Sequence, residues 1–160
     1  MADERFEFAV ELYEKARKLC QQGEPELAMD LCRRSLELCA TAEARTLPGW
    51  IYHDQGRVDD AIAECKKAIE LDPDFGNPYN DIGAYLIEKG DYDNAVGWLE
   101  KATRSSRYRG HHFPWYNLGR VHAAKELFNR ATECFEHALE IEPDYTEAET
   151  APRRLKLLVQ

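Results

Sequence analysis

This chain of 160 residues has no long apolar run and none of the short motifs that mark common catalytic sites. No stretch is apolar enough to cross a bilayer, and the start MADERFEF lacks the basic and apolar segments of a signal peptide. There is no glycine-rich phosphate loop, no G-x-S-x-G and no H-E-x-x-H. We therefore predict a soluble, cytoplasmic protein that is not an enzyme and has no membrane contact.

The sequence also has no cysteine pair with redox or zinc spacing. Its five cysteines are an odd number without a C-x-x-C, which is typical of reduced thiols in a cytoplasm rather than of a disulfide framework. His111 and His112 are adjacent instead of four residues apart on a helix, so their rings are not expected to share a metal ion. We predict no metal and no cofactor.

Basic residues are scarce except in one segment. The chain is 44% apolar and 32% charged, which suits a packed core of one domain, and its net charge is -9. Residues 101–125 nevertheless carry six basic residues and no acidic one. We call this segment the basic island. It either balances the charge of neighbouring acidic helices or contacts an acidic partner.

No alternation of apolar and polar residues is long enough to indicate a strand, whereas one alanine recurs with a long period. Ala28, Ala61, Ala95 and Ala131 are separated by 33, 34 and 36 residues. The positions four and seven residues later also hold small or apolar residues, which places them on one helical face. They are Cys32, Cys65, Leu99 and Phe135, then Ser35, Ala68, Ala102 and Ala138.

Each period predicts two helices joined by a tight turn. Gly23, Gly56 and Gly90 separate the two helices in three of the units, and Pro73 and Pro143 close two units. We predict a single all-α domain over residues 1–160, with repeats at 6–40, 42–75, 76–109 and 112–145 and a capping helix at 146–159. Such a hairpin cannot bury its apolar stripe alone, so each unit covers its neighbour.

This pattern resembles the tetratricopeptide repeat, a 34-residue helix-turn-helix with the signature W-x-x-L-G-x-x-Y, then A-x-x-x-F, then P. The last unit matches with Trp115, Leu118 and Gly119, followed by Ala131, Phe135 and Pro143, while His122 replaces the tyrosine. We expect His122 to be a satisfied core histidine. The resemblance implies a right-handed superhelical solenoid in which Gly83 and Gly119 allow close helix packing.

Three places depart from the pattern. Pro48 falls inside an expected helix, so we predict that the helix starts near Pro48, that Thr46 or Leu47 forms its cap, and that residues 40–47 are an irregular link. A hinge or an opened groove is the alternative. In the tail, Pro152 is expected to open the main part of the capping helix with Thr150 as its cap. The connection 104–114 is two residues longer than the others.

The resemblance implies a concave groove, lined by the first helices, that holds an extended peptide or a partner helix. Asn117 resembles the family's residue that binds a ligand's backbone. The carboxylate clamp of chaperone-binding members is incomplete here, because Tyr13, Arg17, Leu47, Asn77 and Asp81 stand at its positions. The predicted partner-binding residues are Trp50, Asn80, Asp81, Phe113, Tyr116, Asn117 and Arg120, with a basic rim of Arg104, Arg107 and Arg109.

Several partners remain open. A cationic peptide would lie over Asp54, Asp81 and Glu88, whereas an acidic or phosphorylated one would contact the basic rim and Arg120. Self-association through exposed apolar residues such as Phe6 and Phe8 would make the chain a homo-oligomer without a peptide ligand. Nucleic acid is the least favoured partner, since the net charge of -9 opposes its attraction to the basic island.

Overall fold

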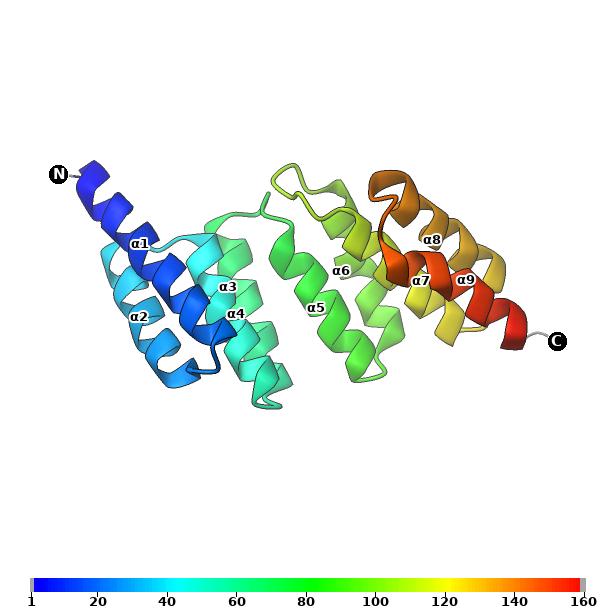
Figure 1. Cartoon of the computed structure of the whole chain (residues 1–160), viewed down its shortest axis with the longest axis horizontal. Coiled ribbons are helices and arrows are strands. Elements are labelled where there is room, and N and C mark those ends of the chain that lie inside the picture. The colour runs from blue at the N-terminus through cyan, green and yellow to red at the C-terminus, as the bar shows by residue number, and fades with distance from the viewer. Residues whose placement is uncertain (1, 159–160) are drawn as a thin grey trace. The chain divides into compact units, whose positions relative to one another are not determined.

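A computed structural model describes residues 2–158 of the chain, and these residues are organised into nine α-helices with no strand among them (Figure 1). The side chains are described from residue 3 to residue 157. The helices pair as antiparallel hairpins, with one extra helix at the end. Their bounds are α1 Ala2–Gln21, α2 Pro25–Leu38, α3 Ala42–Asp54, α4 Val58–Leu71, α5 Asn77–Glu88, α6 Tyr92–Arg104, α7 His112–Ala124, α8 Phe128–Ile141 and α9 Thr146–Leu158.

Contacts between residues divide the chain into two compact units, Met1–Pro73 and Asp74–Gln160. In the first unit α1 packs on α2, α2 on α3 and α3 on α4. In the second unit the same sequential packing runs from α5 to α9, and α5 also contacts α7. The prediction of an all-α fold made of repeated hairpins is confirmed. The single domain and the repeat bounds stay predictions.

The recurring alanines are the closest packing points of the second helices. Ala28, Ala61, Ala95 and Ala131 are each fully buried, and the residues four and seven positions later are buried as well. On the facing helices the glycines allow the backbone to approach. A Cβ on Gly83 would lie 2.3 Å from Leu99 Cδ2, and one on Gly119 would lie 2.4 Å from Phe135 Cε1. The predicted role of both glycines is confirmed.

The turns inside the hairpins use left-handed backbone. Gly23, Gly56 and Gly90 lie between the two helices of a hairpin, as predicted, and have φ values of 80°, 76° and 75°. The fourth hairpin has no glycine at this place, and Glu126 adopts a φ of 59° instead. A residue with a Cβ is disfavoured in this conformation, so the fourth turn carries a local backbone cost.

The prediction that the third helix starts near Pro48 is wrong. Helix α3 begins at Ala42, because the side chain of Thr41 caps it by accepting a hydrogen bond from the Ala44 amide. Pro48 lies inside the helix and has no N–H to donate to the Ala44 carbonyl four residues earlier. The buried thiol of Cys32 donates to that carbonyl at 3.0 Å. A side chain of the preceding helix thus satisfies the acceptor that proline leaves open.

Of the predicted irregular link at 40–47, only residues 40 and 41 lie outside a helix, and neither residue predicted as the cap has that role. Thr46 is buried within α3 and donates its hydroxyl to the Glu43 carbonyl at 2.7 Å. Leu47 is fully buried in the core cluster of the first unit. Their burial explains why the helix continues through Pro48.

The expectation that Pro152 opens the main part of the capping helix, with Thr150 as its cap, is wrong. Helix α9 begins at Thr146, with Pro152 inside it, and Thr150 donates to the Glu147 carbonyl instead of capping the helix. Ala148 and Leu155 form the buried side of α9 among the described side chains. The side chains of Leu158 and Val159 lie outside the described residues.

The long connection between α6 and α7 is bound to the start of the second unit. Arg107 donates its amide to the Asp74 carbonyl at 3.0 Å and accepts from the Gly76 amide at 3.1 Å. Its guanidinium lies 5.1 Å above the ring of Phe75. Tyr108 packs against Gly76, where a Cβ would lie 2.5 Å from the tyrosine side chain.

Candidate functional site

Asn80, Asn117 and Arg120 form a chain of hydrogen bonds between α5 and α7. The Asn117 amide nitrogen donates to Asn80 Oδ1 at 3.0 Å, and the Asn117 amide oxygen accepts from the Arg120 guanidinium at 3.0 Å. Both asparagines are buried, whereas Arg120 is exposed. The nitrogen and the oxygen of the Asn117 side-chain amide are therefore both bonded to other side chains of the protein, and the bond from the oxygen orients Arg120.

Phe113 and Tyr116 belong to an aromatic cluster at the start of α7. Tyr145 lies at its centre, with ring centroids 5.6 Å from Phe113 and 5.2 Å from Tyr116, both edge-on. Tyr116 also lies 5.5 Å from Phe135 in the core. Burial, assisted by the Glu147 carboxylate, raises the pKa of Tyr145 to about 12. These rings hold one another, and Phe113 remains 42% exposed.

Asp81 follows Asn80 on the same helix. It is half-buried on α5, and its carboxylate, second to burial itself, raises the pKa of Tyr108 in the long connection. Trp50 lies on α3 in the first unit, where it packs against the core cluster around Leu47 and Ile51. Of the predicted partner-binding residues, the structure therefore brings Asn80, Asn117 and Arg120 into one hydrogen-bond chain and Phe113 and Tyr116 into one aromatic cluster.

The basic rim is dispersed. Arg104 ends α6, Arg109 is exposed in the connection, and Arg107 lies on Phe75.

His122, which was expected to be a satisfied core histidine, is only half-buried, and its Nδ1 is buried without a hydrogen-bond partner among the described residues. Burial lowers its pKa, assisted by Arg130 and Lys125. The expectation is wrong for that nitrogen.

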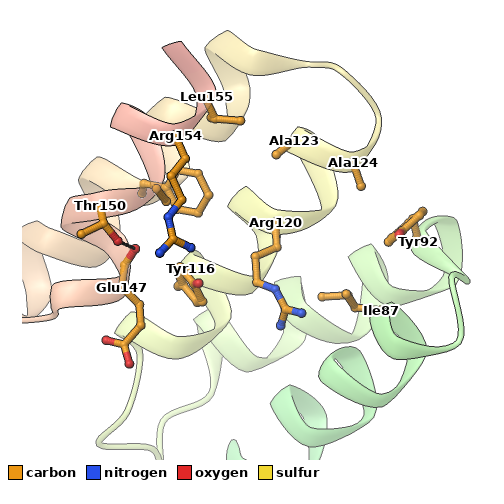
Figure 2. A pocket seen from close by; sticks show the side chains of 12 residues that line it. Ile87, Tyr92, Tyr116, Arg120, Ala123, Ala124, Glu147, Thr150, Arg154 and Leu155 are labelled. Carbon is orange, nitrogen blue, oxygen red and sulfur yellow. Dashed lines mark hydrogen bonds between the residues drawn. The ribbon is translucent and has the colours of Figure 1, made fainter. Parts of the chain in front are cut away.

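A pocket of about 380 Å³ lies beside Arg120, between α7 and α9 (Figure 2). Figure 2 shows Arg154 extending from α9 toward Tyr116, while Arg120 extends from α7 toward Ile87. We call it the C-terminal pocket. Apolar residues form most of its wall, and polar groups stand around them. The lining residues are Ile87, Tyr92, Tyr116, Arg120, Ala123, Ala124, Phe135, Glu147, Thr150, Ala151, Arg154 and Leu155.

No sequence pattern pointed to Arg154, Glu147 or Thr150 as pocket residues. Arg154 is exposed on α9. Its place on the pocket depends on how α9 packs against α8, where Leu155 joins the core cluster of Ala131 and Phe135. Among described residues, no group of three His, Cys, Asp or Glu side chains is arranged to hold a metal ion. In that same part of the chain, no helix is both long and apolar enough to span a membrane.

Models of the tetratricopeptide repeat match three consecutive stretches of the chain, residues 49–86, 77–108 and 112–145. Bacteriophage adsorption protein A of Escherichia coli (strain K12) is 31% identical over 80 residues, which are 50% of this chain and 8% of that protein. Protein SGT1 homolog of Oryza sativa subsp. japonica is 33% identical over 93 residues, 58% of this chain and 25% of that protein. The chain spans about a quarter or less of these relatives.

Solved structures show the same fold. Pseudomonas aeruginosa pilF has a TM-score of 0.88 at 23% identity, over 95% of this chain and 69% of that one. YrrB, described as a TPR protein with an unusual peptide-binding site, has a TM-score of 0.69 at 22% identity, over 91% and 74%. The first TPR of Spaghetti (RPAP3), bound to the HSP90 peptide SRMEEVD, has a TM-score of 0.67 at 21% identity, over 74% and 93%.

Proposed function

Because this chain belongs to the tetratricopeptide repeat family, we propose that it is a non-enzymatic module that binds an extended peptide or a helix of another protein on the faces of α5 and α7. Stacked repeats offer such surfaces in place of a catalytic cleft. Two of the similar structures are described as peptide-bound or peptide-binding, which supports the proposal. Five free cysteines support a reducing compartment such as the cytoplasm.

The observation that carries the proposal is the hydrogen-bond chain from Asn80 through Asn117 to Arg120, next to the aromatic cluster of Phe113 and Tyr116. The buried Asn117 amide holds one nitrogen of the Arg120 guanidinium, and Arg120 is otherwise exposed. A partner therefore meets a donor and aromatic rings that are already ordered, so it loses less entropy on binding than it would on a flexible surface.

An acidic partner segment fits this surface better than a basic one. Arg120 presents a charged donor that suits a carboxylate. Of the acidic residues proposed to receive a cationic peptide, Asp81 is half-buried and faces Tyr108. The basic rim of Arg104, Arg107 and Arg109 supplies secondary contacts in this proposal, and nucleic acid is not the preferred ligand.

Peptide arrays test whether the chain binds peptides and whether it prefers acidic or basic ones. The chain is probed with extended peptides that share aromatic residues but differ in net charge, and the affinities of the hits are measured by fluorescence anisotropy. We expect acidic peptides to be selected, and the double variant Asn117→Ala, Arg120→Glu to lose on the order of tenfold or more in affinity. Arg130→Glu on α8 is the matched control and retains binding. Selection of basic peptides, or an unchanged double variant, would reject this surface.

A further inference from the structure

We propose that the C-terminal pocket binds helix α1 of a second copy of this chain, so that copies associate head to tail. This inference does not rest on the peptide-binding proposal, since self-association requires only the chain itself. It rests on two surfaces with matching chemistry: a pair of exposed apolar residues beside two acidic side chains on α1, and an apolar pocket that carries two arginines.

The first surface is one side of α1. Asp3, Phe6, Glu7 and Val10 follow the spacing i, i+3, i+4 and i+7, which places them on a common helix face. Phe6 is 48% exposed and Val10 is 37% exposed. Asp3 and Glu7 take part in no ion pair within the described chain. This face, which we call the acidic face of α1, presents apolar surface bordered by two carboxylates.

The opposite side of α1 packs against α2 within the first hairpin. Ala9, Leu12 and Ala16 are buried, and the Ala9 carbonyl accepts a hydrogen bond from the Ser35 hydroxyl of α2 at 2.7 Å. The acidic face is therefore held in a fixed helical register by the packing of the first hairpin. A preformed amphipathic helix is suited to binding in an apolar groove through residues at these spacings.

The second surface is the C-terminal pocket. Phe135 and Leu155 contribute apolar wall from α8 and α9, and Arg120 and Arg154 bring two guanidinium groups to its edge. Arg120 uses one nitrogen on Asn117, and Arg154 has no ion pair among the described side chains. The unpaired charges on the pocket are thus opposite to those on the acidic face.

Glu147 is the one acidic side chain on the pocket wall. It stands seven residues before Arg154 on α9, which corresponds to roughly 10 Å along the helix axis. Figure 2 shows the Arg154 side chain extending back toward Thr150 and Tyr116 and Arg120 extending toward Ile87, so two guanidinium groups face the acidic face against this one carboxylate.

The contact joins two different surfaces, so each copy keeps one free acidic face and one free pocket. Such heterologous contacts produce open chains of copies, or a ring where the rotation closes. A symmetric dimer through a single patch would behave differently. The mode of growth therefore distinguishes this proposal from other forms of self-association.

Sedimentation velocity over a concentration series tests the contact. We expect the wild-type chain to grow in mass with concentration and to dissociate as salt rises, because the charges lie at the edge of the contact. Phe6→Ser and Arg154→Glu are expected to weaken association on the order of tenfold or more. Phe8→Ser and Arg153→Glu are the controls, since Phe8 is 46% exposed on another side of α1 and Arg153 is exposed on α9 and paired with Glu149.

Mixing the two variants gives the sharpest test. Phe6→Ser retains the pocket and Arg154→Glu retains the acidic face, so an equal mixture should form a one-to-one complex that does not grow further. Circular dichroism verifies that each variant keeps the wild-type helix content, and Arg154→Gln provides a second variant if it does not. A wild-type chain that stays monomeric at all concentrations, controls that weaken association as strongly, or variants that fail to recombine would overturn the proposal.

Discussion

The second and fourth hairpins use the same repeat positions with different side chains. In α3, Gly49 follows Pro48 and faces Cys65, and a Cβ on Gly49 would lie 3.2 Å from the Ala61 carbonyl oxygen and 3.7 Å from the Cys65 sulfur. In α7, Gly119 follows Leu118 and faces the ring of Phe135, 2.4 Å from such a Cβ. The repeat thus fixes a close helix approach, while the size of the facing residue sets how much space remains.

The largest expected effect comes from filling that space in the fourth hairpin. We expect Gly119→Ala to destabilise the protein by about 1–3 kcal/mol, because the core ring of Phe135 has to move, whereas Gly49→Ala costs less. Urea unfolding of both variants, followed by circular dichroism, measures the difference in the free energy of unfolding. Equal costs at the two glycines would show that the facing residue does not decide the tolerance.

The second prediction concerns Pro48, which has no counterpart in α7. Burial raises the pKa of the Cys32 thiol to about 12, so the thiol keeps its proton and donates to the Ala44 carbonyl. We expect Cys32→Ala to destabilise the protein by about 1–3 kcal/mol, since the carbonyl becomes unsatisfied. The loss should shrink in a Pro48→Ala background, where an amide can bond the same carbonyl.

A double-mutant cycle of the two substitutions at positions 32 and 48 measures this coupling. Additive free energies of unfolding would show that the thiol and the proline act independently.

The smallest expected effect is in the turns. Glu126 holds a left-handed backbone that Gly56 adopts in the second hairpin. We expect Glu126→Gly to stabilise the protein by about 0.5–1 kcal/mol and Gly56→Ala to destabilise it by about 1 kcal/mol, since only glycine lacks the Cβ penalty. Thermal unfolding of the two variants shows whether each substitution raises or lowers the stability of the protein. A destabilised Glu126→Gly protein would mean that the glutamate side chain contributes more than its backbone strain costs.

The sequence predicted the repeat because one buried alanine and one glycine turn recur at a fixed period, and both depend on local geometry. It failed at Pro48, because the thiol that satisfies the Ala44 carbonyl lies on the preceding helix, 12 residues from that carbonyl. It also missed Arg154, whose position on the pocket is set by the packing of Leu155 against α8. The hydrogen bond between Asn80 and Asn117 joins residues that are 37 positions apart in the sequence, and no spacing pattern predicts it.

The connection that carries the two additional residues between the third and fourth repeats is bonded to the segment before α5. These two residues allow Arg107 to reach both Asp74 and Gly76 with its backbone, and Tyr108 to close against the glycine before α5. A version of this chain trimmed there to the ordinary 34-residue interval would have to fasten the beginning of α5 in some other way. An insertion that departs from the repeat length can thus hold the start of a helix that lies more than thirty residues earlier in the sequence.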